Sequence, residues 1–157
     1  VIARMEPENN IEMIIKGYLD SEKARNLVVV GSLETKFGKY ISEKYNDNSI
    51  KYIGFVSGIH NLNSLRNFSN LYFHGHSVGG TNPSLVEMMH FERPIVAFDC
   101  VYNRATLEDD GASFRRNWQK LSADFLAPSK RSCVSNPFGF HATHTLNKRP
   151  LGIFGVC

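Results

Sequence analysis

The stretch LYFHGHSVGGTNPSLVEMMHFERPIVAFD, residues 71–99, contains a strand, a loop, a helix and a second strand in close succession. LYFHGHS, which should end near Ser77, and RPIVAFD are short apolar runs typical of buried strands. Between them, Asn82 suits an N-cap and Pro83 suits the first position of the apolar helix SLVEMMHFE. Two strands joined through one helix predict a right-handed βαβ unit with parallel strands.

The same alternation extends to both sides of this unit. Residues 1–3 (VIA) indicate the end of another strand. Helix, strand, helix, strand and helix patterns then follow along residues 7–24, 26–32, 34–46, 50–56 and 61–70. Residues 104–111 favour one helical turn, and residues 117–127 favour a further helix. Short loops between alternating elements predict an α/β fold, a Rossmann-like parallel sheet with helices on both faces.

Composition restricts the class of protein. The 157 residues are 42% apolar and 21% charged, which suits one globular domain. No apolar run approaches the roughly 20 residues that span a bilayer, and no signal peptide opens the chain. The net charge of +3 is slight and its cations are scattered, so no nucleic-acid partner is expected. Cys100, Cys133 and Cys157 form no CxxC pair, which favours reduced thiols and a cytoplasmic location.

The two ends of the sequence differ from its middle. VIAR at residues 1–4 has no initiator methionine and predicts a piece of a longer protein. We expect a domain over residues 1–127 and an irregular tail over residues 128–157, which are rich in Gly, Pro, Ser, Thr and Asn. In that tail, His141 and His144 have no acidic or thiol partner at ligand spacing, so we expect an exposed pair and not a metal site.

The loop VGGTN, residues 78–82, is expected at the carboxyl ends of the strands, where ligands bind in open parallel sheets. Gly79 and Gly80 would let the backbone approach a ligand closely. The first amides of the next helix have no internal acceptors and lie at the positive end of its dipole. The loop therefore suits a phosphate cradle, although it matches neither a P-loop nor a GxGxxG motif and a plain tight turn is the alternative.

Two charged residues flank this loop in the predicted fold. Glu87, about one turn into the helix, could accept hydrogen bonds from sugar hydroxyls. Its alternative is a solvated glutamate favoured by the helix dipole. Arg4 follows the first strand at the same sheet edge and offers a fork for phosphate oxygens, with an ordinary surface arginine as the alternative.

The whole pattern is more specific than its parts. ARMEPENNIEMIIKGY, VVVGS, GFVS, GGTNPSLVEMM, RPIVAFD and NRATLED, in this order and spacing, resemble the C-terminal domain of GT-B glycosyltransferases of the family 4 type. The likeness covers about residues 1–110. Such enzymes commonly carry GR-x-x-PEKN after a strand and E-x-F-G-x-P-x-L-E-A-M at the donor site. The version HGHSVGGTNPSLVEMM is most similar to a bacterial subset that includes rhamnosyltransferases of surface-polysaccharide synthesis.

The resemblance implies a role for each matched position. It assigns Arg4 to the donor diphosphate and Glu87 to the ribose of the nucleotide. It also makes Phe55 and Val56 of GFVS candidates for contact with the base, with core packing at a strand end as the alternative. The loop whose amides would meet the diphosphate comprises Gly79, Gly80, Thr81 and Asn82.

Two departures from the family pattern put the donor-sugar contacts in question. The first glutamate of E-x7-E would fall at Gly79, and the lysine of PEKN is Asn9 here. His74 and His76 are candidates to compensate, because imidazole can hydrogen-bond or counter phosphate charge. Strand alternation places both on one face, with Gly75 leaving the other face open. We count His76 with the catalytic candidates; satisfied side chains at a polar strand end are the alternative.

The resemblance implies transfer of a sugar from a UDP-, dTDP- or GDP-sugar to an acceptor hydroxyl, with retention of configuration. Oriented amides, a helix N-terminus and Arg4 would stabilise the leaving diphosphate. No DxD motif lies at a strand end, and Asp109-Asp110 suit a solvated cap, so neither a metal nor another cofactor is expected. The acceptor, a saccharide or a lipid-linked molecule, would be bound by an N-terminal domain of the full-length protein, which could lie peripherally at the inner membrane face. The present chain alone would turn over little.

Two other classes of protein stay open. A sugar-nucleotide epimerase of GT-B architecture would use similar phosphate contacts on its ligand alone. A non-catalytic regulatory α/β domain, for example a flavodoxin-like one, would explain the alternation without a donor. Flavin binding calls for a Ser/Thr-rich loop after the first strand, which ARMEPENN does not supply.

Overall fold

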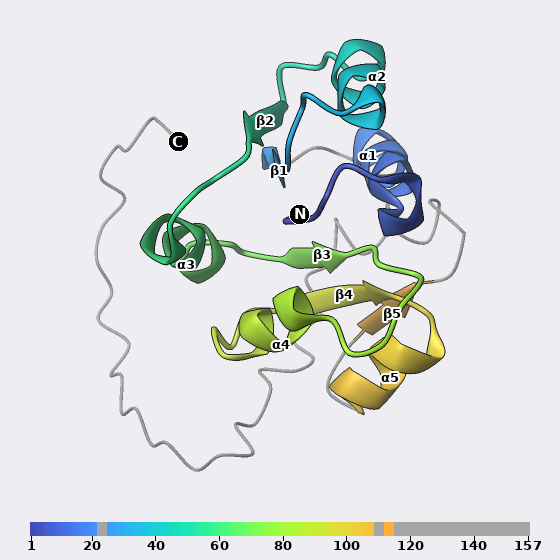
Figure 1. Cartoon of the computed structure of the whole chain (residues 1–157), viewed down its shortest axis with the longest axis vertical. Coiled ribbons are helices and arrows are strands. Elements are labelled where there is room, and N and C mark those ends of the chain that lie inside the picture. Colours follow the sequence, from blue (N-terminus) through green and yellow to red (C-terminus); the bar gives the residue numbers. More distant parts are fainter. Residues whose placement is uncertain (22–24, 109–111, 115–157) are drawn as a thin grey trace.

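The computed structural model describes residues 1–21, 25–108 and 112–114, the last of these by backbone only. Helices and strands alternate through this part of the chain (Figure 1). The predicted helix at residues 117–127, Asp109-Asp110, and the tail with His141 and His144 lie outside the described residues. So do Cys133 and Cys157.

The observed elements follow the predicted order with shifted ends. The strand around residue 73 ends at His74, three residues before the expected Ser77, and the last helix begins at Val101. The elements are η1 (Pro7–Asn9), α1 (Ile11–Leu19), β1 (Leu27–Val30), α2 (Lys36–Lys44), β2 (Ile50–Gly54), α3 (Ile59–Asn67), β3 (Tyr72–His74), α4 (Pro83–Met89), β4 (Ile95–Phe98), α5 (Val101–Leu107) and β5 (Ala112–Phe114).

All the strand pairs are parallel, and the first three residues join two sets of them. β1 pairs with β2, and β4 pairs with both β3 and β5. Ile2 forms a parallel bridge with Val30 of β1, and its carbonyl accepts a hydrogen bond from the Tyr72 hydroxyl of β3 at 3.3 Å. Figure 1 shows the N-terminus between β1 and β3. The resulting order, β2, β1, residues 1–3, β3, β4, β5, is that of a doubly wound Rossmann-like sheet.

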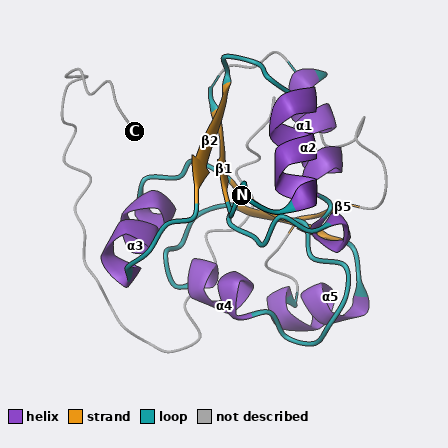
Figure 2. Ribbon diagram, turned by 45° about the horizontal axis from the view of Figure 1, so that its top comes forward, coloured by secondary structure: helices purple, strands orange, loops and turns teal. Residues whose placement is uncertain are grey.

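Alternate residues of the strands pack into two separate clusters. In β4, Val96 and Phe98 join a cluster with α1 and α2, whereas Ile95 and Ala97 join one with α4 and α5. This partition follows from the period of two in a strand and shows that both faces are covered. Figure 2 shows α1 and α2 on one side of the strands and α4 and α5 on the other, as the sequence predicted.

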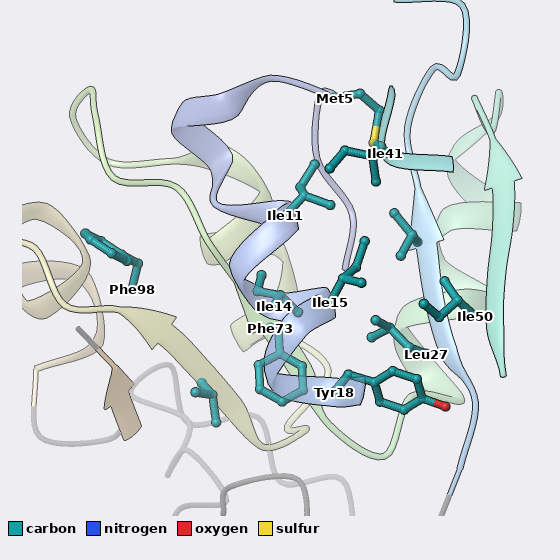
Figure 3. Packing of buried hydrophobic residues seen from close by; sticks show 12 residues of the cluster. Met5, Ile11, Ile14, Ile15, Tyr18, Leu27, Ile41, Ile50, Phe73 and Phe98 are labelled. Carbon is teal, nitrogen blue, oxygen red and sulfur yellow. The ribbon is translucent and has the colours of Figure 1, made fainter. Parts of the chain in front are cut away.

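Helix α1 forms the centre of the larger cluster. Ile11, Ile14 and Ile15 are fully buried, and Tyr18 is nearly so. Figure 3 shows α1 between the strands that carry Leu27 and Ile50 and those that carry Phe73 and Phe98. Full burial of such a side chain contributes about 1.5–3 kcal/mol, so α1 holds both halves of the sheet to one core.

A polar cluster joins the solvent side of α1 to α2. The Oε1 atom of Glu12 accepts hydrogen bonds from Tyr45 at 2.7 Å and from Lys44 at 3.0 Å, and Lys16 lies 3.4 Å away. The hydrogen bond from Tyr45, helped by the two lysines, lowers the pKa of Glu12 to about 2. The ionised carboxylate therefore stabilises the folded chain above the pKa of the unfolded state, near 4.5, and this contribution disappears as pH falls toward 2.

We predict that Glu12→Gln removes part of the acid sensitivity of the fold. Between pH 6 and pH 3.5 the wild-type chain should lose about 1 kcal/mol of unfolding free energy that the variant does not lose, a value reduced for solvent screening. Urea denaturation at several pH values measures this. Glu43→Gln, on an exposed residue of α2, is the control and should follow the wild-type curve. Equal acid sensitivity in Glu12→Gln and wild type would contradict the assignment.

Candidate functional site

Two loops that follow neighbouring strands meet at the carboxyl edge of the sheet. The Asn10 side chain donates to the carbonyl of Gly75 at 2.8 Å. The amide and hydroxyl of Ser77 both donate to the carbonyl of Glu8, at 3.1 and 2.8 Å. The helices after residues 1–3 and after β3 cover opposite faces of the sheet, so this is its switch point, where ligands bind in open α/β sheets.

Gly75 allows the close approach of these loops. A Cβ atom at this position would lie 2.0 Å from the carbonyl oxygen of Asn9, so no other residue fits without a shift of the backbone. The expectation that Gly75 leaves an open face is wrong, because the backbone of Asn9 covers it. Asn9 is itself buried and donates to the carbonyl of Arg4 at 2.8 Å, which shapes the loop behind the arginine.

The two histidines stack beneath the loop. The ring centroids of His74 and His76 are 4.4 Å apart and the planes differ by 16°. Both ring nitrogens of His74 and Nδ1 of His76 are buried and have no hydrogen-bond partner among the described residues. The predicted common face is therefore confirmed, whereas the alternative of satisfied side chains is not what the structure shows.

Burial keeps the histidine pair neutral at physiological pH. It lowers the pKa of His74 to about 3, and the neighbouring His76 acts in the same direction. Burial also lowers the pKa of His76, the positive charge of Arg4 lowers it further, and Glu8 opposes this. His76 thus lies within electrostatic reach of Arg4, whose side chain is exposed.

Asn103, on α5, fixes the backbone of His76. Its side-chain amide donates to the carbonyl of His76 at 2.9 Å and to that of Phe98 at 2.8 Å. One buried amide therefore ties the loop after β3 to the end of β4. The sequence places Asn103 in the motif NRATLED but does not show that it reaches across to another loop.

The glycine loop is open to solvent. Gly79, Gly80 and Thr81 are exposed, and Gly79 has a φ of 96°, which favours glycine. Within the described part of the chain, their amides donate no hydrogen bond. Asn82 is the predicted N-cap, since its side chain accepts from the amide of Ser84 at 3.0 Å, and Pro83 begins α4. The loop therefore presents backbone N–H groups without acceptors next to the capped start of α4.

Glu87 forms an ion pair that the sequence analysis missed. Its Oε2 atom contacts Nη2 of Arg66 on α3, and the arginine side chain is only 3% exposed whereas that of Glu87 is 48% exposed. The exposure of Glu87 agrees with the alternative of a solvated glutamate, which did not include an ion-pair partner. Arg66 looked like an ordinary residue of a polar helix, so the sequence carried no signal for this pair.

The base-contact candidates lie at the same sheet edge, at the end of β2. Phe55 is 78% exposed and Val56 is partly buried. The alternative of core packing is therefore wrong for Phe55. The carbonyl of Gly54, just before it, accepts from the amide of Gly31 at 2.9 Å, which ties this end of β2 to the end of β1.

Residues 1–125 match the family model of glycosyl transferases group 1. The chain belongs to this family. The sequence stretches quoted from residues 1–110 pointed to it, and the observed fold agrees: parallel strands and helices match the C-terminal domains of GT-B glycosyltransferases. A search of curated proteins found no match.

Solved structures of low identity share the glycosyltransferase fold. HepE from Anabaena, solved with UDP, is 16% identical with a TM-score of 0.68; the match covers 83% of this chain and 39% of HepE. TarM is 21% identical with a TM-score of 0.64, over 80% of this chain and 26% of TarM. The C-terminal domain of the group 1 glycosyl transferase LpcC from Francisella tularensis is 14% identical with a TM-score of 0.60, over 78% of this chain and 69% of that domain.

The described residues include neither a cluster of metal-binding side chains nor a membrane-spanning helix. They contain no cluster of three or more His, Cys, Asp or Glu side chains that could hold a metal ion. They also contain no helix with the length and apolar character needed to cross a membrane.

We predict that Gly75→Ala strongly destabilises the domain, because the added methyl group would meet the backbone of Asn9. Overpacking of this kind costs about 1–3 kcal/mol. Gly80→Ala is the matched control, since nothing lies within 4 Å of a Cβ atom there, and it should change stability by less than about 0.5 kcal/mol. Thermal and urea denaturation measure both; equal stabilities would show that the two loops do not meet as described.

A second prediction concerns acid stability. The folded-state pKa of His74 lies below its ordinary value of 6.5, so the unfolded chain binds more protons and stability falls as pH drops below 6.5. From pH 8 to pH 5, His74 alone should remove about 2 kcal/mol of unfolding free energy. His74→Leu should abolish this loss, whereas His60→Leu, at an exposed position of α3, should retain it. Matching pH profiles for the two variants would rule out His74 as the titrating group.

Proposed function

We propose that this chain is the donor-binding domain of a glycosyltransferase that moves a sugar from a UDP-, dTDP- or GDP-sugar to an acceptor hydroxyl. The observation that carries the proposal is the junction of two loops at the switch point of the sheet. The exposed Arg4 directly follows the segment 1–3 that ends there, the unused amides of residues 79–82 follow β3, and the half-exposed Glu87 lies on the helix that begins after this loop. A cation, a set of backbone donors and an acceptor for a sugar hydroxyl are what a nucleotide diphosphate needs from its site.

The diphosphate would bind between Arg4 and the loop amides. Charge develops on it as the bond to the sugar breaks, and fixed donors stabilise that charge without reorganisation. His76 would act as a neutral hydrogen-bonding group toward the donor, because burial and Arg4 keep its pKa low. Asn103 would hold the backbone of His76 in place during the reaction.

The nucleoside would extend from the loop toward the ends of α4 and β2. Glu87 would accept hydrogen bonds from the ribose, and Phe55 with Val56 would flank the base. The large exposure of Phe55 supports this, since an aromatic ring that stays 78% exposed is available for a base. HepE has been solved with UDP and with UDP-glucose, which supports a nucleotide ligand for this fold.

The rest of the reaction follows the family resemblance. We propose retention of configuration, no metal or other cofactor, and an acceptor that is a saccharide or a lipid-linked molecule. The match covers 39% of HepE and 26% of TarM, so this chain corresponds to part of each. We propose that an N-terminal domain of the full-length protein binds the acceptor. S. aureus TarM has been solved with UDP, alpha-GlcNAc-glycerol and fondaparinux, which supports a saccharide acceptor. Rhamnosyl transfer in bacterial surface-polysaccharide synthesis, in the cytoplasm at the inner membrane face, completes the proposal.

A nucleotide panel tests the site. Calorimetry of this chain with UDP, dTDP and GDP should show binding of at least one, and Arg4→Ala and Glu87→Ala should each weaken it about tenfold, the effect of one charge-assisted hydrogen bond. Arg25→Ala and Glu43→Ala are matched controls at exposed positions away from the loops and should leave affinity unchanged.

Two results would replace the proposal. A folded chain that binds none of the three nucleotides would indicate a regulatory α/β domain. Conversion of a free sugar nucleotide by the full-length protein with no acceptor present would indicate an epimerase.

A further inference from the structure

Arg66 is a buried cation whose partner, Glu87, is one of the candidate ligand residues. Its side chain is 3% exposed, and Nη2 contacts Oε2 of Glu87. Nη1 donates to the side chain of Asn63 at 3.0 Å, one turn earlier on α3, while the Arg66 carbonyl accepts from the Ser69 hydroxyl at 2.8 Å. The guanidinium is thus oriented by its own helix before it meets Glu87.

The difference in burial decides which residue holds the other. An unpaired arginine is costly to bury, so Arg66 requires its carboxylate. Glu87, at 48% exposure, would be stable in solvent without a partner. The ion pair therefore stabilises the buried Arg66 more than it stabilises Glu87. It also restricts the Glu87 side chain, which would otherwise sample several rotamers.

The restraint leaves half of the carboxylate available. Only Oε2 contacts Arg66, and Oε1 has no hydrogen bond to the described residues. α3 precedes β3 and α4 follows it, so the pair bridges the two helices on either side of that strand. A carboxylate held by one oxygen presents the other at a fixed place.

We infer that Arg66 is a positioning residue: it holds Oε2 of Glu87 so that the carboxylate is directed at a sugar hydroxyl of a bound nucleotide. This rests on the proposed function, since Glu87 is the ribose contact there. Preorganisation of this kind reduces the conformational entropy lost on binding. Arg66 touches no ligand and acts only through Glu87.

The test measures recognition of one hydroxyl group. UDP, dTDP and GDP are each compared with their 3′-deoxy analogues by calorimetry on this chain. The wild type should prefer the hydroxylated nucleotide that it binds by about tenfold. Arg66→Met should reduce that preference to below about twofold. Arg66→Lys, which keeps the charge but not the planar guanidinium, should leave a preference of about threefold.

The readout separates positioning from general stability. If Arg66 had a purely structural role, its replacement would weaken the binding of the nucleotide and of its 3′-deoxy analogue equally. The ratio of the two affinities would then keep its wild-type value. Arg93→Met is the matched control, because Arg93 also contacts α3, through Asn67 at 3.5 Å, but lies beyond α4 at the start of β4. It should lower melting temperature without changing the ratio. If Arg66→Met does not fold, Arg66→Lys decides.

Each remaining outcome has one meaning. A wild-type ratio in the folded Arg66 variants overturns the inference and leaves the proposed function intact. Binding by the wild type without preference for the 3′-hydroxyl overturns it too, while the diphosphate site stands. No binding of any nucleotide by the wild type rejects the proposed function and the inference with it.

Discussion

The pairing of the first three residues with β1, beside β3, is the constraint on which the site depends. The amide of Val30 donates to the carbonyl of Val1 at 2.9 Å, and the amide of Ala3 donates to the carbonyl of Val30 at 3.0 Å. The strand ladders form two separate sheets, β1–β2 and β3–β4–β5, and the short extended segment of residues 1–3 lies between β1 and β3 (Figure 1). Its direction brings residues 4–10 to the edge where β3 ends, and there the helices diverge to opposite faces. The switch point at this sheet edge is therefore a result of topology before any side chain is considered.

Side-chain amides then convert that topology into a rigid rim. Asn9, Asn10 and Asn103 each donate to a backbone carbonyl of a loop at this edge. Each bond satisfies a carbonyl that the strand ladders do not pair. The bonds of Asn10 and Asn103 also join segments that no strand ladder connects, whereas that of Asn9 holds its own loop in shape. In contrast, Arg4 and residues 79–81 stay exposed on this rim. Fixed backbone and exposed donors together are what electrostatic preorganisation requires.

The alternation of patterns was enough to predict the fold, because period and turn chemistry are local. The β-branched run 27–30 and the Asn82-Pro83 cap both formed as expected. Strand ends were harder: β3 stops at His74 because residues 75–77 pair with the loop at residues 8–10 and not with a strand. The Arg66–Glu87 pair could not be predicted, since the two residues meet only after α3 and α4 pack. Candidate ligand residues were recognisable by motif, but the side chains that hold them were not.

Asn9 shows how this loop differs physically from the family pattern. The resemblance leads one to expect a lysine there as a second phosphate cation. Asn9 is 1% exposed and its amide is bonded to the carbonyl of Arg4, so an ammonium in that place would be buried without a counter-ion. The loop therefore has the side-chain amide of Asn9, which holds the loop conformation, at the position where the family pattern has a lysine. The buried histidines do not replace that charge, because they are neutral. Any anion at this edge depends on Arg4 and on backbone amides, which makes the geometry of residues 79–82 more important than the number of cations.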